Sequence, residues 1–288
     1  MIVNFSIKNF GPIKERQTLS FEAEKSTHLE DAYVFRSGKH RLLKVALIYG
    51  PNASGKTSLL EALEFLRNLV VFPKNKKTEE FDFEPFLFDP DTPHEHTELS
   101  IEFIKDNIRY FYEVKLNKKA IVSEELINWN PHKASLYKRT TDLSNQLTKI
   151  SFGSTVKIDN ASKKTLETNT LWNNTVVGGY LKTNIDFNEL KSVFSWFSGD
   201  LKPLIRTGTE LEDFVSDQIN SGNIKKPDVI EILKKADFHI SDIEIKEEEK
   251  EIPDHVLEFL TKQFEESKKE GKASRSLAIE FWKSSKTA

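Results

Sequence analysis

The sequence predicts an α/β fold in which a mixed sheet carries antiparallel hairpins and the second half of the chain is mostly helical. Three observations predict it. Apolar residues recur at every second position near the N-terminus and again from residue 99 to residue 126. A glycine-rich turn joins a short apolar run to a segment with helical apolar spacing. Helix caps and apolar stripes dominate after about residue 180.

The composition narrows the class of protein. A chain of 288 residues is long enough for one large or two ordinary domains. Its 45 acidic and 42 basic residues give a formal net charge of −3, which argues against a strongly basic nucleic-acid-binding surface. Without cysteines, disulfides and cysteine nucleophiles are excluded. No apolar run is long enough for a signal peptide or a membrane span, so we expect a cytoplasmic protein without a membrane partner.

The N-terminal elements are predicted to be strands. Residues 3–7 alternate apolar and polar side chains, Gly11-Pro12 forms a turn, and residues 18–23 alternate again, which indicates a hairpin. Residues 43–49 (LKVALIY) form a short apolar run of the kind found in strands buried on both faces.

The stretch ALIYGPNASGKTSLLEAL, residues 46–63, contains the pattern G-x-x-x-x-G-K-T of a phosphate-binding loop. Its glycines let the backbone turn tightly, and successive backbone N–H groups at a helix N-terminus favour an anion. We expect Lys56 to bind the β- and γ-phosphates of ATP, Thr57 to bind Mg²⁺, and Ser58 to lie near the α-phosphate. A turn that merely joins a strand to a helix is the alternative. The expected ATP-binding residues are Gly50, Asn52, Ala53, Ser54, Gly55, Lys56, Thr57 and Ser58.

The remaining elements follow from periodicity and caps. Residues 57–71 have helical spacing, and residues 99–116 read as a hairpin followed by a third strand near 120–126. Residues 130–180 are polar, and we expect long connections with short elements there. Helices are predicted to begin near Asp186, Thr209 and Pro227. A strand at 243–245, a helix near 254 and a strand at 276–282 complete the prediction.

The loop GPNASGKT, with Asn52 inside it, and the preceding IVNFSIKNFGPI resemble the ABC-type ATPase heads of the SMC, RecF and overcoming-lysogenization-defect group. More narrowly, they resemble the AAA/ABC-type ATPases of bacterial antiphage and abortive-infection operons. The resemblance is specific over residues 1–70, although Gly11-Pro12 stands where many relatives have Arg-Ser. It implies a P-loop NTPase, ABC-ATPase-head-like fold that binds ATP and Mg²⁺, forms homo-oligomers through its heads, and gates a partner effector, often a nuclease.

The resemblance also suggests a domain division. We expect the N-terminal part of a P-loop ATPase lobe at 1–128 and a mostly helical second lobe with long loops at 129–240. Residues 241–288 would return to the ATPase lobe as strand, helix and strand, leaving the head incomplete at its C-terminus.

Hydrolysis in such heads needs an acidic motif after a buried apolar strand, and a signature motif. Asp89, after Phe86-Leu87-Phe88, is the nearest match, but flanking prolines favour a turn. No catalytic residue is assigned, and we expect ATP hydrolysis only if those motifs lie beyond residue 288 or on a partner. His94-Glu95-His96 has no third ligand nearby, which favours a solvated loop over a metal site.

Three functional hypotheses follow. The first is an ATP-binding head of an antiphage defence system in which ATP-driven dimerisation gates an effector. The second is a RecF- or SMC-like DNA-repair head, which the near-neutral composition does not support. The third is a nucleotide-binding interaction module that does not hydrolyse ATP.

Overall fold

The computed structural model describes residues 1–245. They belong to two compact units, Met1–Arg206 and a second that begins at Thr207, and each unit is described by itself. The expected helix near 254 and strand at 276–282 lie outside the described residues.

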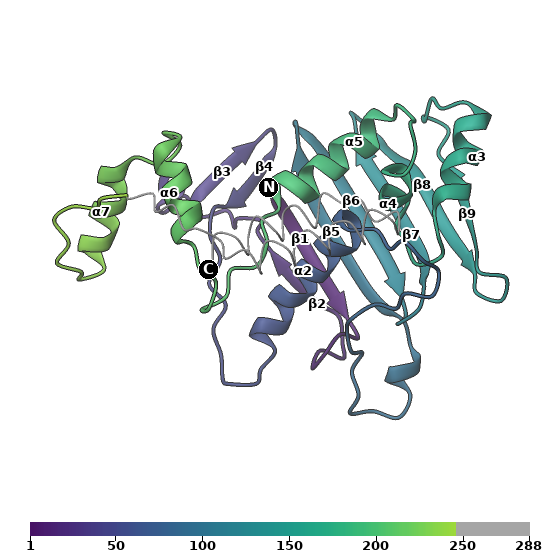
Figure 1. Cartoon of the computed structure of the whole chain (residues 1–288), viewed down its shortest axis with the longest axis horizontal. Coiled ribbons are helices and arrows are strands. Elements are labelled where there is room, and N and C mark those ends of the chain that lie inside the picture. Colours follow the sequence, from purple (N-terminus) through teal and green to yellow (C-terminus); the bar gives the residue numbers. More distant parts are fainter. Residues whose placement is uncertain (246–288) are drawn as a thin grey trace, which may run out of the picture. The chain divides into compact units, whose positions relative to one another are not determined.

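The first unit is built on a seven-stranded sheet in the order β2-β1-β5-β6-β7-β8-β9 (Figure 1). Every pairing in it is antiparallel, so the mixed sheet that we expected is wrong for the described strands. Short turns explain this for β5 to β9, because a parallel pair needs a long crossover, whereas β1 pairs antiparallel with β5 across a long stretch of sequence. The strands are β1 (Ile2–Lys8), β2 (Gln17–Ser20), β5 (Thr97–Lys105), β6 (Ile108–Leu116), β7 (Ile121–Trp129), β8 (Lys133–Asp142) and β9 (Leu147–Phe152).

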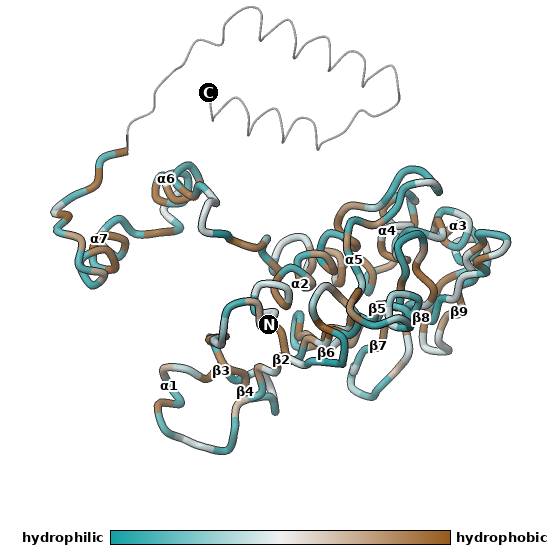
Figure 2. The backbone as a smooth tube through the Cα atoms, turned by 90° about the horizontal axis from the view of Figure 1, so that it is seen from below, coloured by the Kyte–Doolittle hydropathy of each residue, from teal (hydrophilic) through white to brown (hydrophobic). Residues whose placement is uncertain are grey.

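Helices cover one face of this sheet and form the core with it (Figure 1). The apolar stripe of α2 supplies Ala62, Leu66 and Val70, all fully buried. These side chains meet inward-facing strand residues such as Phe5 and Ile101. The tube of α5 alternates between hydrophobic and hydrophilic colours, as expected for a helix that buries one face (Figure 2). The covering elements are α2 (Lys56–Val71), α3 (Asn160–Asn169), α4 (Val176–Tyr180), α5 (Asn188–Ser195) and the π-helical turn η2 (Trp196–Asp200).

A small hairpin precedes the glycine-rich loop. β3 (Val34–Ser37) and β4 (His40–Leu43) pair antiparallel after the short helix α1 (Glu30–Tyr33). Backbone hydrogen bonds from Leu43 to Phe21 and from Ala23 to Arg41 join this hairpin to the chain that follows β2.

The predicted antiparallel hairpins and the helix after the glycine-rich loop are confirmed, but residues 130–180 are more ordered than we expected. They contain β8, β9, α3 and α4, and β8 pairs with β7 across the domain boundary that we placed at 128–129. The observed boundary falls at 206–207 instead. Residues 129–152 therefore extend the sheet and do not begin a helical lobe. Their polar composition misled the prediction because β9 is an edge strand with largely exposed side chains.

A buried polar cluster joins β6, β7, β8 and the start of α4. Both oxygens of Glu124 accept hydrogen bonds from the backbone N–H of Val176, at 3.1 and 3.0 Å, and Oε1 accepts from the hydroxyls of Tyr112 (3.0 Å) and Tyr137 (2.6 Å). Arg139 lies opposite Glu124 in the sheet register, 3.9 Å away, and both side chains are fully buried. Burial raises the pKa of Glu124, and Arg139 opposes the rise.

The same arginine also orders the chain before α4. Its Nη2 donates to the carbonyls of Leu171 and Trp172, at 3.3 and 3.0 Å, and to Thr148. The Glu124 cluster, by which we mean Tyr112, Glu124, Tyr137, Arg139 and the Val176 N–H, therefore fixes the 171–176 segment on the sheet.

The second unit contains α6 (Glu212–Asn220) and α7 (Lys226–Lys235) among its described residues. Both were predicted, and Pro227 lies in the first turn of α7 as expected. The strand expected at 243–245 is not formed. Lys226 pairs with Asp242 at 2.7 Å, and Glu231 pairs with Lys235 one turn later on α7.

Candidate nucleotide-binding site

The segment that leads into the glycine-rich loop is not a strand, so that prediction is wrong for residues 44–49. Within residues 1–245, no hydrogen bond uses the backbone of residues 45–49. Their apolar side chains face solvent, with Leu47 86% and Tyr49 93% exposed. A run of this composition becomes a strand only beside neighbouring strands, and no described strand lies next to it to pair with.

The loop itself has the backbone geometry of a tight turn into a helix. Gly55 is the residue before the first turn of α2, with φ +85°, and Ala53 is also left-handed at φ +62°. A side chain at Gly55 would be strained by that backbone conformation. Residues 50–54 and Thr57 are exposed, while Lys56 and Ser58 are half-buried in the first turn. The predicted set of residues is therefore brought together, as its sequence continuity requires.

Seven successive backbone N–H groups, those of residues 52–58, have no hydrogen-bond partner among the described residues. The first N–H groups of any helix lack a partner within that helix, and here the turn before α2 adds more. Together with the positive end of the helix dipole, these donors suit a phosphate group. The residues present therefore fit the expected nucleotide.

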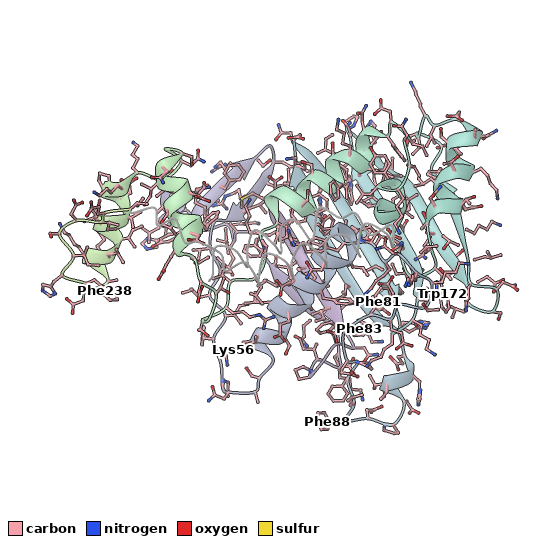
Figure 3. The ribbon with its side chains drawn as sticks, viewed as in Figure 1. Lys56, Phe81, Phe83, Phe88, Trp172 and Phe238 are labelled. Carbon is pink, nitrogen blue, oxygen red and sulfur yellow. The ribbon has the colours of Figure 1, made fainter. Side chains whose placement is uncertain are left out.

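Lys56 lies over its own loop. Its Nζ donates to the carbonyls of Gly50 (2.9 Å) and Pro51 (2.5 Å). Figure 3 places Lys56 at the start of α2, at the lower edge of the view. Because both acceptors are backbone carbonyls within six residues, the ammonium group can exchange them for phosphate oxygens without unfolding any element.

The N-terminal turn packs against the loop. A Cβ at Gly55 would lie 3.5 Å from Ile13 and 3.7 Å from Pro12, and a Cβ at Gly11 would lie 4.0 Å from the Ser58 hydroxyl. The turn is held by Asn9, a fully buried residue that sequence reasoning did not assign to the site. Its side chain bonds to the backbone of Phe86 (2.8 Å) and of Thr92 (2.8 Å).

Asp89, the nearest match to an acidic motif, has a structural role. Its Oδ1 accepts from the backbone and hydroxyl of Thr92, at 3.0 and 2.9 Å, at the start of the short turn η1 (Thr92–His94). Its other oxygen pairs with Lys14 at 2.6 Å. Lys14 and Thr92 hold the pKa of Asp89 well below its ordinary value. The turn that we predicted there is confirmed, without the preceding strand.

The histidine pair near this turn lies at the protein surface. Glu95 pairs with Lys8 at 3.1 Å, and His94 and His96 are exposed. Across residues 1–245, no group of three or more potential ligands is arranged to hold a metal ion.

The outer face of α2 is joined to the chain that ends the first unit. Arg67 donates to the carbonyl of Leu201 at 2.8 Å. Glu61 and Glu64 pair with Arg206 at 3.0 and 3.3 Å. The helix that starts at the glycine-rich loop is thus fixed both by the core and by residues 201–206.

Comparison with known proteins gives one family match. A family model described as "AAA domain, putative AbiEii toxin, Type IV TA system" matches residues 45–168. No curated protein matches the chain. No helix in residues 1–245 is long and apolar enough to cross a membrane. The matched range begins at the lead-in segment and includes the loop, α2 and most of the sheet. It supports an AAA/P-loop ATPase-like domain in this part of the chain.

Proposed function

We propose that the chain binds ATP with Mg²⁺ through residues 50–58. The observation that carries this is the row of seven unpaired backbone N–H groups at the start of α2, beside a lysine that is held only by local carbonyls. Lys56 would neutralise the β- and γ-phosphates, and the exposed hydroxyl of Thr57 would bind the metal ion. Mg²⁺ would supply charge neutralisation between the phosphate oxygens.

In the proposed role, binding of ATP regulates a partner effector. The protein would act as the ATPase head of an antiphage defence system, in which ATP-driven pairing of two heads gates a partner effector. The AAA-type match, whose family description includes a toxin of a toxin–antitoxin system, supports a defence role. The resemblance of GPNASGKT to antiphage ATPases supports the same role.

A second candidate is a nucleotide-binding module that does not hydrolyse ATP. The engagement of Asp89 with Lys14 and Thr92 favours it, because the contacts of this carboxylate are with the turn around η1. Hydrolysis of ATP by the purified chain, lost in Lys56→Ala, would eliminate this candidate.

The binding site is tested with Lys56→Ala and with Lys149→Ala, a matched change of an exposed lysine on β9. We expect Lys56→Ala to weaken ATP binding by roughly 100-fold, the size of two charge-assisted hydrogen bonds, and Lys149→Ala to leave it unchanged. Isothermal titration with Mg-ATP measures both. Equal affinity in the two variants would contradict the assignment.

The binding of Mg²⁺ by Thr57 and the ATP-driven pairing of two heads are tested separately. Thr57→Ala should remove the Mg²⁺ dependence of ATP binding, and Thr57→Ser should keep it, since only the hydroxyl is needed. Sedimentation of the chain with and without Mg-ATP measures pairing of heads. A sedimentation coefficient that does not change with bound ATP would reject the dimerisation step while leaving the binding site intact.

A further inference from the structure

A cavity lies at the end of β5 that is opposite to the end near the glycine-rich loop. Its volume is about 260 Å³, and three turns line it: the β3–β4 turn with Lys39 and His40, the β5–β6 turn with Asn107, and the end of β7 with Trp129. Ser37 donates to Asn107 at 3.2 Å and so joins the first turn to the second. The cavity is smaller than the roughly 300–1,000 Å³ of sites for drug-sized ligands, which limits the ligand to a small group.

The strand directions separate this cavity from the loop. β5 begins at Thr97, whose hydroxyl donates to the carbonyl of Asn9 next to the turn that touches Gly55. β5 ends beside the cavity, which Ile104 lines. Nine strand residues span roughly 25 Å at about 3.3 Å each. A nucleotide held at Lys56 therefore does not reach this cavity. In Figure 3, Lys56 lies at the opposite end of the strands from the β3–β4 hairpin of Figure 1.

Arg109 is the most ordered cation in the cavity. Its Nε donates to Glu102, which also accepts from Asn4 at 3.0 Å, and its guanidinium lies 4.8 Å from the centre of the Trp129 ring. Its two terminal nitrogens form no hydrogen bond with the residues that the structure describes. Glu102 and Trp129 together fix the orientation of this guanidinium group. Its two terminal nitrogens therefore point their N–H donors in a set direction, in the geometry that binds a phosphate group.

Glu102 pairs with Arg109, and the other charged or titratable residues that line the cavity are Lys39 and His40. Lys39 lies at the exposed tip of the hairpin, next to Gly38 with φ +55°. The pKa of His40 is lowered, first by burial and then by Arg109 and Lys39, against weaker opposing effects of Glu22 and Glu102. The lining contains no carboxylate. The cavity therefore favours an anion.

Trp129 adds a flat apolar wall. The Lys133 ammonium lies 5.7 Å from its ring centre, and Lys133 is exposed on a flexible side chain. A planar ring can displace this lysine and stack on the indole, which is how aromatic residues hold unpaired bases. A nucleotide presents a phosphate and a base. The arginine and the lysine suit the phosphate, and the tryptophan ring suits the base.

We propose that this cavity binds one nucleotide unit, with its phosphate on Arg109 and Lys39 and its base against Trp129. The unit comes either from a free nucleotide or from the 5′ end of single-stranded nucleic acid, since both present the same chemistry.

The experiment uses the full chain carrying Lys56→Ala, so that the glycine-rich loop does not contribute. The probes are adenosine 5′-monophosphate, a 5′-phosphorylated five-residue oligothymidylate, the same oligomer without the 5′ phosphate, and inorganic phosphate. Fluorescence anisotropy of labelled oligomers and calorimetry for the small probes measure affinity. Lys39→Glu is the test variant, and Lys149→Glu carries the same charge reversal on β9 as its control.

We expect at least one phosphorylated nucleotide probe to bind, and Lys39→Glu to weaken it by about tenfold, the size of one charge-assisted hydrogen bond. Lys149→Glu should stay within about twofold. Tighter binding of the phosphorylated oligomer than of the mononucleotide would identify a nucleic-acid end, and equal binding would identify a free nucleotide. No binding of either probe, or equal losses in the two lysine variants, would overturn the proposal.

The role of the ring is tested with Trp129→Phe and Trp129→Ala, with circular dichroism to confirm that both fold. Trp129→Phe should retain binding of the nucleotide probe, and Trp129→Ala should reduce its affinity to that of inorganic phosphate. An alanine variant that folds and binds the nucleotide normally would show that Trp129 only braces Arg109 and Lys133, and would overturn the base contact.

Discussion

Two polar clusters in the first unit are organised in opposite ways. The carboxylate of Glu124 is fully buried and draws its partners from β6, β8 and the start of α4, far apart in the sequence. Lys56 is half-buried as a residue, and its ammonium group bonds only to carbonyls within six residues. The first arrangement fixes parts of the fold to each other. The second leaves its donors able to change partners, which a ligand site requires.

The lead-in segment strengthens this comparison. Residues 45–49 are apolar and exposed, while the Glu124 cluster is polar and buried, so each contradicts the simple rule that apolar residues lie inside. The polar cluster is tolerated because its carboxylate is satisfied by several donors. Leu47 and Tyr49 of the apolar segment contribute little packing to the first unit.

The largest effect is expected from Glu124→Ala. Removing the carboxylate leaves Arg139 buried without its counter-ion and two tyrosine hydroxyls buried without their acceptor, which costs about 3–5 kcal/mol of the free energy of unfolding. The control is Glu125→Ala on the same strand. Glu125 pairs at 3.1 Å with Lys138, which is exposed, so this substitution should lower the free energy of unfolding by only about 0–1 kcal/mol. Urea denaturation measures both. Similar losses would mean that the buried cluster does not hold the fold.

A comparison of two leucines comes next. Leu66→Ala in the buried stripe of α2 should destabilise the protein by about 2–5 kcal/mol, because it leaves a cavity. Leu47→Ala should change stability by no more than about 0.5 kcal/mol, because Leu47 is 86% exposed. A large loss for Leu47→Ala in the same denaturation experiment would show that the lead-in segment is packed in solution.

The two carboxylates Glu124 and Asp89 should give opposite pH dependences. The pKa of Glu124 is raised by burial, so its contribution is present below its ordinary 4.5 and is lost as pH rises through the folded-state value. The pKa of Asp89 is lowered by Lys14 and Thr92, so its contribution is present above 3.8 and is lost as pH falls.

These signs are checked by urea midpoints measured between about pH 2.5 and pH 8. Relative to the unmodified chain, Glu124→Gln should flatten the decline of stability on the alkaline side. Asp89→Asn should flatten the decline on the acid side. A shift of both variants in the same direction would contradict the assigned causes.

The smallest effect is expected from Arg206→Ala. Its two ion pairs with α2 are exposed, and their loss should cost no more than about 1 kcal/mol. Hydrogen exchange should nevertheless increase at the amide of Leu204, which donates to Glu64 at 3.2 Å. Unchanged exchange there would show that Arg206 does not help to hold the 201–206 segment against α2.

Sequence reasoning predicted the features that depend on local pattern. The hairpins of β1 with β2 and of β5 with β6, the helix α2, and the geometry of the turn before it all follow from neighbouring residues. It failed where the outcome depends on distant partners. Residues 44–49 have strand composition but no adjacent strand among the described residues, and Glu124 and Arg139 meet only because β7 pairs with β8. β8 and β9 were missed because their exposed face is polar.

The position of Arg206 has a mechanical consequence. This residue is the last of the first unit, and it is tied to Glu61 and Glu64, one turn apart on the helix that begins at Lys56. The residue at which the first unit ends is therefore fastened to the helix that begins at the glycine-rich loop. Through the ion pairs of Glu61 and Glu64, α2 connects the glycine-rich loop to Arg206, the residue after which the second unit begins.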